Sequence, residues 1–209
     1  MKSASFFIAS FLLFLFATSQ EANAQWAQTN GPHNITITAM ASIGTDLFVG
    51  GDGVSRSTNN GVTWTSVDNG ITDGFINALT VTDSNTLSPM LFASNTAGDV
   101  YRSSDEGQSW VTVDSGLSGL VTQTLASSGS DLYAGFYQGV YRTTDHGTSW
   151  SNASNGLPSN PDISNFAITG DLSASPVIFA GTSKGMFQSS DKGMTWTAET
   201  VYRIITFGR

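Results

Sequence analysis

The sequence lacks cysteine, has only two histidines and carries few charges. The absence of cysteine excludes a disulfide framework, a thiolate metal site and a cysteine nucleophile. Two histidines are too few for a zinc site built mainly from imidazoles. Charged residues make up 11% of the chain, against about 25% in an average soluble domain. With 8 basic and 16 acidic residues, the chain cannot neutralise a run of phosphates, so we predict no nucleic-acid partner.

Long apolar runs are also absent, except at the N-terminus. Lys2 precedes the apolar segment 6–17, and Ala22 and Ala24 place small residues at a cleavage site. This pattern predicts a signal peptide over residues 1–24, cleaved before Gln25, and a secreted or periplasmic protein. The apolar run of 12 residues would span about 18 Å as a helix, less than a hydrocarbon core of about 30 Å. We therefore predict no membrane span after cleavage.

One eight-residue unit, the octet, is present four times. It begins with Ser or Thr, has Asp or Asn third and Gly fifth, and ends in Trp. The copies align without gaps at 57–64, 103–110, 143–150 and 189–196. Their tryptophans are 46, 40 and 46 residues apart, a period typical of the roughly 40–50-residue blades of a β-propeller.

Each octet lies in a larger repeat of four expected strands, named A, B, C and D in chain order, with the octet between C and D. The expected A strands are 35–42, 76–82, 121–127 and 163–169. No segment after residue 25 has a sustained 3.6-residue apolar period, so we expect essentially no helix. A single sheet cannot bury both faces, so the sheets should stack as blades. The predicted fold is all-β: a propeller, or an open propeller fragment, of about four four-stranded antiparallel blades.

Domain boundaries follow from this repeat. Blades are expected at 32–70, 71–116, 117–156 and 157–199. Residues 25–31 resemble 64–70 and are predicted to form a leading outer strand, whereas 200–209 would begin an incomplete blade. Three interpretations remain open: a truncated product of a longer gene, an open arc or small ring with unusual pairing, and a ring completed by association. An unpaired blade edge would favour self-association.

The octet is expected to form the C–D hairpin turn. The Asp or Asn side chain accepts main-chain N–H bonds, Gly permits a positive φ, and Trp buries its ring. The predicted structural residues are Ser57, Asn59, Gly61, Trp64, Ser103, Asp105, Gly107, Trp110, Thr143, Asp145, Gly147, Trp150, Ser189, Asp191, Gly193 and Trp196.

The octet resembles the Asp-box (BNR repeat) motif, and the chain resembles secreted bacterial members of the Asp-box propeller family. That family includes sialidases, xyloglucan-degrading hydrolases, sortilin-type receptors and photosystem II assembly-factor-like proteins. The resemblance implies that the octets are structural and lie at the blade periphery, and that ligands bind on the opposite face.

Candidate site residues are few. Arg56, Arg102 and Arg142 occupy one repeat position, so we expect each to cover its own blade rather than to converge on a ligand. The D–A and B–C connections should share the face opposite the octets. The acids there that do not form a repeated set are Asp52, Asp73, Asp99 and Asp162. They are the candidates for the two carboxylates of a glycoside hydrolase, although solvated loop acids are the simpler interpretation. No calcium-loop motif occurs, and we predict no metal and no cofactor.

The leading hypothesis is a secreted, non-enzymatic binding or scaffold module for a protein or a glycan. It rests on short loops and on the lack of a convergent base and nucleophile. The alternative is a glycoside hydrolase of sialidase or xyloglucanase type, of which only part is present. Two of the four acids about 5–10 Å apart in one cleft would favour the hydrolase.

Overall fold

The computed structural model describes residues 29, 31–32, 36–83, 86–169 and 176–199. The predicted leader 1–24, most of the predicted leading strand 25–31, and the segment 200–209 lie outside the described residues. Within these ranges the chain forms 16 β-strands, and no described helix is long and apolar enough to cross a bilayer.

The strands form four antiparallel sheets, each with four strands in chain order, and we refer to these as blades 1 to 4. Blades 1 and 2 contain β1 (Ala39–Ile43), β2 (Asp46–Gly51), β3 (Gly53–Ser57), β4 (Thr65–Ser66), β5 (Ile76–Thr82), β6 (Met90–Asn95), β7 (Val100–Ser103) and β8 (Val111–Thr112). Blades 3 and 4 contain β9 (Thr124–Ser128), β10 (Asp131–Gly135), β11 (Val140–Thr143), β12 (Ser151–Asn152), β13 (Ile163–Thr169), β14 (Val177–Thr182), β15 (Gly185–Ser189) and β16 (Thr197–Ala198).

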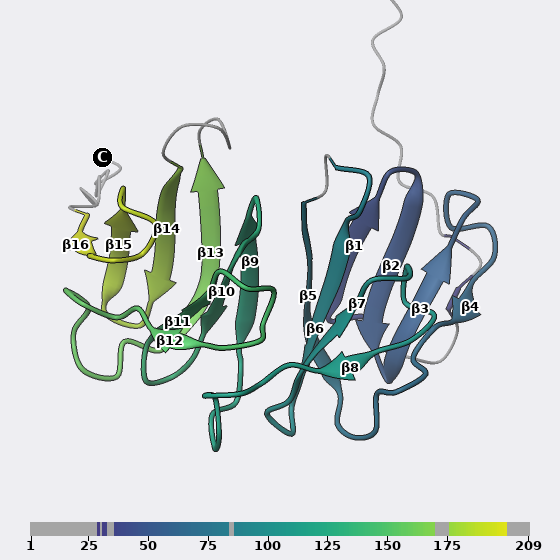
Figure 1. Ribbon diagram of the computed structural model, residues 1–209, viewed down its shortest axis with the longest axis horizontal. Coiled ribbons are helices and arrows are strands. Elements are labelled where there is room, and N and C mark those ends of the chain that lie inside the picture. The colour runs from purple at the N-terminus through teal and green to yellow at the C-terminus, as the bar shows by residue number, and fades with distance from the viewer. Residues whose placement is uncertain (1–28, 30, 33–35, 84–85, 170–175, 200–209) are drawn as a thin grey trace, which may run out of the picture.

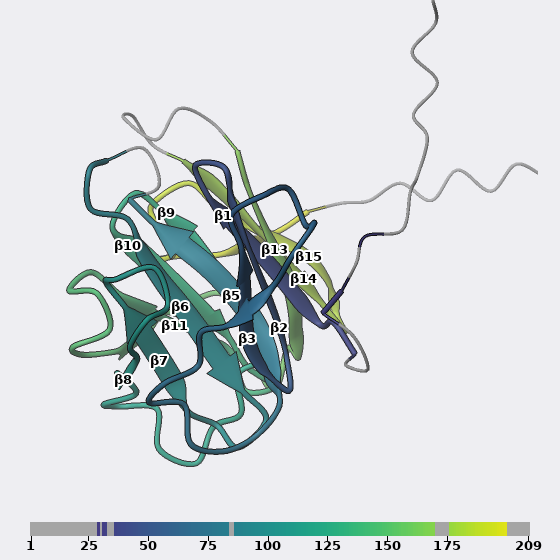
Figure 2. The same cartoon turned by 90° about the vertical axis from the view of Figure 1, so that its right-hand side faces the viewer.

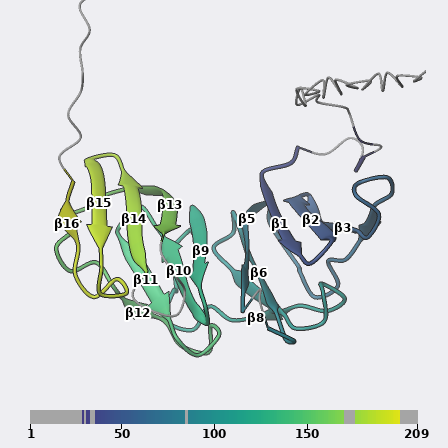
Figure 3. The ribbon, with the colours of Figure 1, turned by 90° about the horizontal axis from the view of Figure 1, so that it is seen from above.

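The blades follow one another in an arc. Their first strands, β1, β5, β9 and β13, are neighbours in chain order along the inside of this arc (Figures 1 and 3). Figure 2 shows β5–β8 beside β1–β3 from the side. Because the strands alternate in direction, the D–A and B–C connections lie on one face, along the lower edge of Figure 1, and the A–B turns and octets lie on the other. We call these the loop face and the octet face.

Two first strands begin later than expected. We predicted strands over 35–42 and 121–127, but β1 begins at Ala39 and β9 at Thr124. The preceding amides still bond to the second strand, Thr38 N to Gly50 O at 3.0 Å and Gln123 N to Gly135 O at 2.8 Å. β5 and β13 do span the expected residues, but their pairing with the second strand shifts register at the equivalent position. The shift lies between Ile76 and Ala78 in β5 and between Ile163 and Asn165 in β13. The chain therefore bulges at the start of each first strand, and sequence alternation alone did not locate this bulge.

The core consists of three clusters, one at each junction between blades. The junction of blades 1 and 2 buries Phe48 and Leu91, that of blades 2 and 3 buries Phe92 and Leu132, and that of blades 3 and 4 buries Tyr133. Phe48, Phe92 and Tyr133 occupy the same position of the second strand and are fully buried. In the first three blades, an aromatic side chain of the second strand therefore packs towards the next blade, as expected for sheets that bury each other's faces.

Candidate functional site

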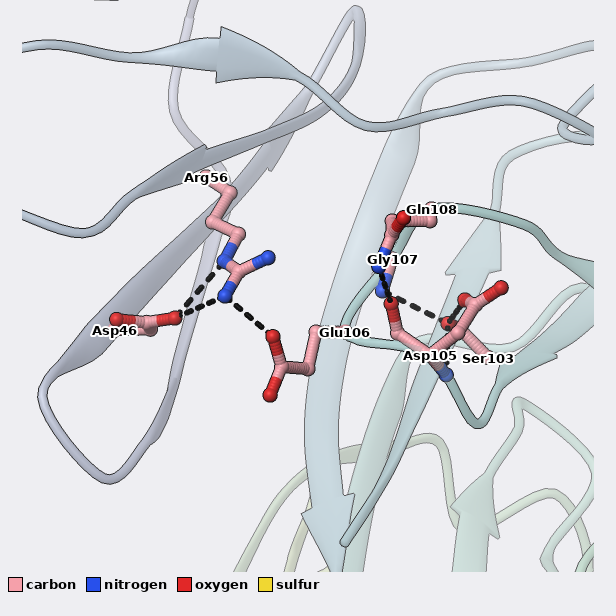
Figure 4. A network of polar contacts seen from close by, with 7 residues as sticks. All are labelled: Asp46, Arg56, Ser103, Asp105, Glu106, Gly107 and Gln108. Carbon is pink, nitrogen blue, oxygen red and sulfur yellow. Dashed lines mark hydrogen bonds and ion pairs between the residues drawn. The ribbon is translucent and has the colours of Figure 1, made fainter.

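The octets form compact side-chain-capped turns. In blade 2, the Ser103 hydroxyl donates to Asp105 Oδ1 at 2.8 Å and accepts from Gly107 N at 2.8 Å. Asp105 Oδ1 also accepts from Ser109 N at 2.9 Å. Gly107 has φ 86°, and Glu106 before it has φ 58°. Figure 4 shows Ser103, Asp105 and Gly107 of this turn, in which the hydroxyl and the carboxylate together satisfy main-chain N–H groups of the hairpin.

The octet tryptophans also join neighbouring blades. The indole N–H groups of Trp110, Trp150 and Trp196 donate to main-chain oxygens of Val67, Val113 and Ala153 in the preceding blade, each at 2.7 Å. Trp64, in blade 1, donates instead to Gly61 O within its own octet at 3.2 Å. Three octets therefore hold the last strand of the blade before them, a role that the sequence did not reveal.

The repeated arginines do not converge on one ligand. Arg56 pairs with Asp46 in its own blade and with Glu106 of the next octet (Figure 4). Arg102 donates to His146 O of the next octet at 3.0 Å. Arg56 and Arg102 also contact the next blade, because the next octet lies within reach of each guanidinium.

The octet carboxylates predict a pH dependence of stability. Bonds from Thr143 and Ser149 lower the pKa of Asp145 from 3.8 to about 2. Because this pKa is lower in the folded state, the ionised Asp145 carboxylate stabilises the fold above about pH 4. This contribution is lost as the pH falls towards about 2. We expect Asp145→Asn to flatten the fall in unfolding free energy across that window, measured by urea denaturation at several pH values. An unchanged slope would contradict this assignment.

The first octet shows why the amide is a suitable replacement. Asn59 Oδ1 accepts from Thr63 N at 2.8 Å and from the Ser57 hydroxyl at 3.0 Å, as the aspartates do in the other octets. We therefore expect Asp145→Asn to leave stability at pH 7 nearly unchanged, whereas Asp145→Ala should lower it by about 1 kcal/mol.

The loop face has an acidic hollow at blade 1. This open hollow of about 410 Å³ is lined by Asp52 from the β2–β3 turn and by Asp68 and Asp73 from the β4–β5 connection. The Ser66 hydroxyl donates to Asp68 Oδ1 at 2.8 Å. Gly53 leaves room for the Asp68 carboxylate, because a Cβ there would overlap it. The hollow therefore brings two predicted acids together with a third.

Asp99 and Asp162 are held by other side chains. Asp99 Oδ2 accepts from the Tyr101 hydroxyl at 2.9 Å and from Asn95 Nδ2 at 3.0 Å. Asp162 Oδ1 accepts from Gln123 Nε2 at 2.9 Å, at the junction of blades 3 and 4. Of the four predicted acids, Asp52 and Asp73 thus line one hollow.

Asp68 is a lining residue that the sequence analysis did not place in a site. The available signal was its position four residues after Trp64, where strand D returns beside the B–C turn. No group of three or more metal-ligating side chains is arranged to hold an ion in the part of the chain that the structure describes.

The solved structures that resemble this fold are β-propellers. An ancestral GH74 enzyme matches with a TM-score of 0.65 and 19% identity over 80% of this chain and 24% of its own. The extracellular domain of a one-component system protein from B. thetaiotaomicron matches with a TM-score of 0.64 and 15% identity over 83% of this chain and 23% of its own. YCF48 bound to D1 peptide matches with a TM-score of 0.54 and 16% identity over 78% of this chain and 53% of its own.

The described residues therefore form four blades of a β-propeller, as the sequence predicted. The chain spans about a quarter of the length of the first two proteins and about half of the third. No protein-family model matches the sequence, and no curated protein matches it. At these identities the likeness shows the fold alone, and this fold occurs both in an enzyme and in proteins of other kinds.

Proposed function

We propose that the chain is an exported, non-enzymatic Asp-box propeller module that binds a protein or a glycan through its loop face. The single observation that carries this proposal is the gathering of acids on the loop face, in an open hollow and in hydrogen-bonded loop positions. Open, polar surfaces of this kind suit reversible recognition by hydrogen bonds. The extracellular propeller domain and the peptide complex of YCF48 support the proposal by analogy.

The arrangement of the acids argues against hydrolysis as the leading function. Catalysis by two carboxylates needs one protonated acid and one free carboxylate on opposite sides of a scissile bond. Asp99 and Asp162 already accept hydrogen bonds from neighbouring side chains. Asp52 and Asp73 share a hollow that is open to solvent, which does little to exclude water from a reacting bond.

A binding screen with mapping tests the proposal. The mature protein would be screened on glycan arrays and against envelope proteins. Amide hydrogen exchange would then be compared with and without the captured ligand. We expect protection in the D–A and B–C connections and none in the octets. Protection confined to the octets, or no ligand in either screen, would refute the proposal.

The shared hollow also gives the hydrolase alternative a specific test. If Asp52 and Asp73 were the catalytic pair, the protein would release sugars from xyloglucan or from sialosides, and Asp52→Asn or Asp73→Asn would abolish the release. We expect no release by the unaltered protein. Hydrolysis that disappears in both variants would establish the alternative.

A further inference from the structure

The four blades provide an internal reference, because a residue type found in one blade only is not explained by the repeat. Tyr137 is such a residue. It lies at the tip of the β10–β11 turn, where the equivalent residues of blades 1, 2 and 4 are Asp52, Thr96 and Ser183. It is 53% exposed and is the only aromatic residue among the exposed large hydrophobic residues of the described ranges. Core packing therefore does not account for this ring.

Two polar residues beside Tyr137 also depart from the repeat. Asp162 precedes the buried Ile163, whereas the equivalent positions hold Thr36, Phe75 and Val121. Gln123 lies at the bulge of the first strand. Its equivalents all donate to main-chain oxygens: Thr38 to Ile76 O, Asn77 to Thr122 O and Ser164 to Gly181 O. Gln123 instead donates to the Asp162 carboxylate at 2.9 Å.

The fold brings these three departures together on the loop face. Asp162 N donates to Tyr137 O at 3.0 Å, and Asp162 O accepts from Ser183 N at 3.3 Å. Residues of blades 3 and 4 therefore meet at Asp162, and Gln123 fixes the carboxylate there. This cluster at the junction of blades 3 and 4 is separate from the acidic hollow, which lies at blade 1.

We propose that Tyr137, Asp162 and Gln123 form a subsite for a neutral pyranose unit of a glycan. This inference rests on the proposed binding function and specifies its ligand class. The exposed ring offers an apolar surface for one face of a sugar. Asp162 Oδ2, which accepts no hydrogen bond from the described residues, and the Gln123 amide oxygen supply acceptors for adjacent hydroxyl groups.

The cluster suits a neutral glycan better than a cationic peptide. A bidentate pair with Arg would use both carboxylate oxygens, but Asp162 Oδ1 already accepts from the Gln123 amide. Lys184, exposed on the β14–β15 turn next to Ser183, adds a positive charge to this part of the loop face. Hydroxyl groups tolerate both features, since they donate to a carboxylate and accept from an ammonium group.

Replacing the ring tests the subsite directly. The mature protein would be titrated calorimetrically with cello-, manno-, xylo- and chito-oligosaccharides and with a xyloglucan heptasaccharide. We expect Tyr137→Ala to weaken binding by about tenfold or more, and Tyr137→Phe, which keeps the ring face, to bind within about threefold of the unaltered protein. Asp162→Asn should weaken binding severalfold, because Asn lacks the charge of the carboxylate. The variant should still fold, since Asn tolerates the φ of 55° at this position.

A matched control lies on the octet face. Met194 is also exposed, at 63%, and Met194→Ala should leave binding unchanged. Thermal melting of all variants distinguishes lost binding from lost folding. Full binding by Tyr137→Ala, or no binding of any of these neutral sugars, would overturn the subsite. If exchange protection on the loop face then came from a basic peptide or another protein, the binding function would stand without it.

Discussion

Replacing Trp110 with Ala is expected to remove about 3–5 kcal/mol from the free energy of unfolding. The ring is 4% exposed and belongs to the cluster between blades 1 and 2. Its indole N–H donates to Val67 O, and its main-chain N donates to Asn69 O at 2.9 Å. The substitution therefore opens a cavity and also leaves a carbonyl of the neighbouring blade unpaired. Urea denaturation followed by circular dichroism would measure the loss.

Trp64 provides the matched control for this prediction. It occupies the same octet position, but its side chain is only partly buried and its N–H bonds within its own turn. We expect Trp64→Ala to cost about 1–2 kcal/mol, since less apolar surface is lost. Trp110→Phe should fall between the two, because it keeps most of the buried ring but removes the donor. Equal losses for Trp64→Ala and Trp110→Ala would show that the bond between blades contributes little.

The elements within each blade could be predicted from the sequence because they depend on local pattern. The run at 131–135 alternates little and is entirely buried, as expected for a second strand covered on both sides. The octet at 103–110 fixes its own turn through bonds between residues two and four apart. Such contacts join residues that are close in sequence, so they can be predicted from the sequence alone. The number and the order of the strands could therefore be predicted as well.

The contacts between blades could not be predicted in the same way. The bond from Trp110 to Val67 spans 43 residues, and that from Gln123 to Asp162 spans 39. Each depends on the angle and the separation at which two sheets pack, which no local pattern specifies. For this reason the strand order could suggest one face for the four candidate acids, but which of them line a hollow and which accept hydrogen bonds from other side chains became visible only in three dimensions.

Gly156 provides a second test of the packing between blades. It has φ 92°, and a Cβ at this position would overlap the main-chain oxygen of Trp196 in the next octet. The preceding Asn155 O accepts from Trp196 N at 2.8 Å, so this turn cannot move away without losing that bond. We expect Gly156→Ala to lower the free energy of unfolding by about 3 kcal/mol, through steric overlap together with left-handed backbone strain. Thermal and urea denaturation would measure the change.

Gly129 separates the two causes. It also has a positive φ, 59°, but a Cβ there would meet no atom within 4 Å. Gly129→Ala should therefore show the cost of the backbone conformation alone, about 1 kcal/mol. The additional loss of unfolding free energy in Gly156→Ala would then measure the cost of the steric overlap with the main-chain oxygen of Trp196. If both variants lost the same free energy, the close approach at Trp196 would not constrain the fold.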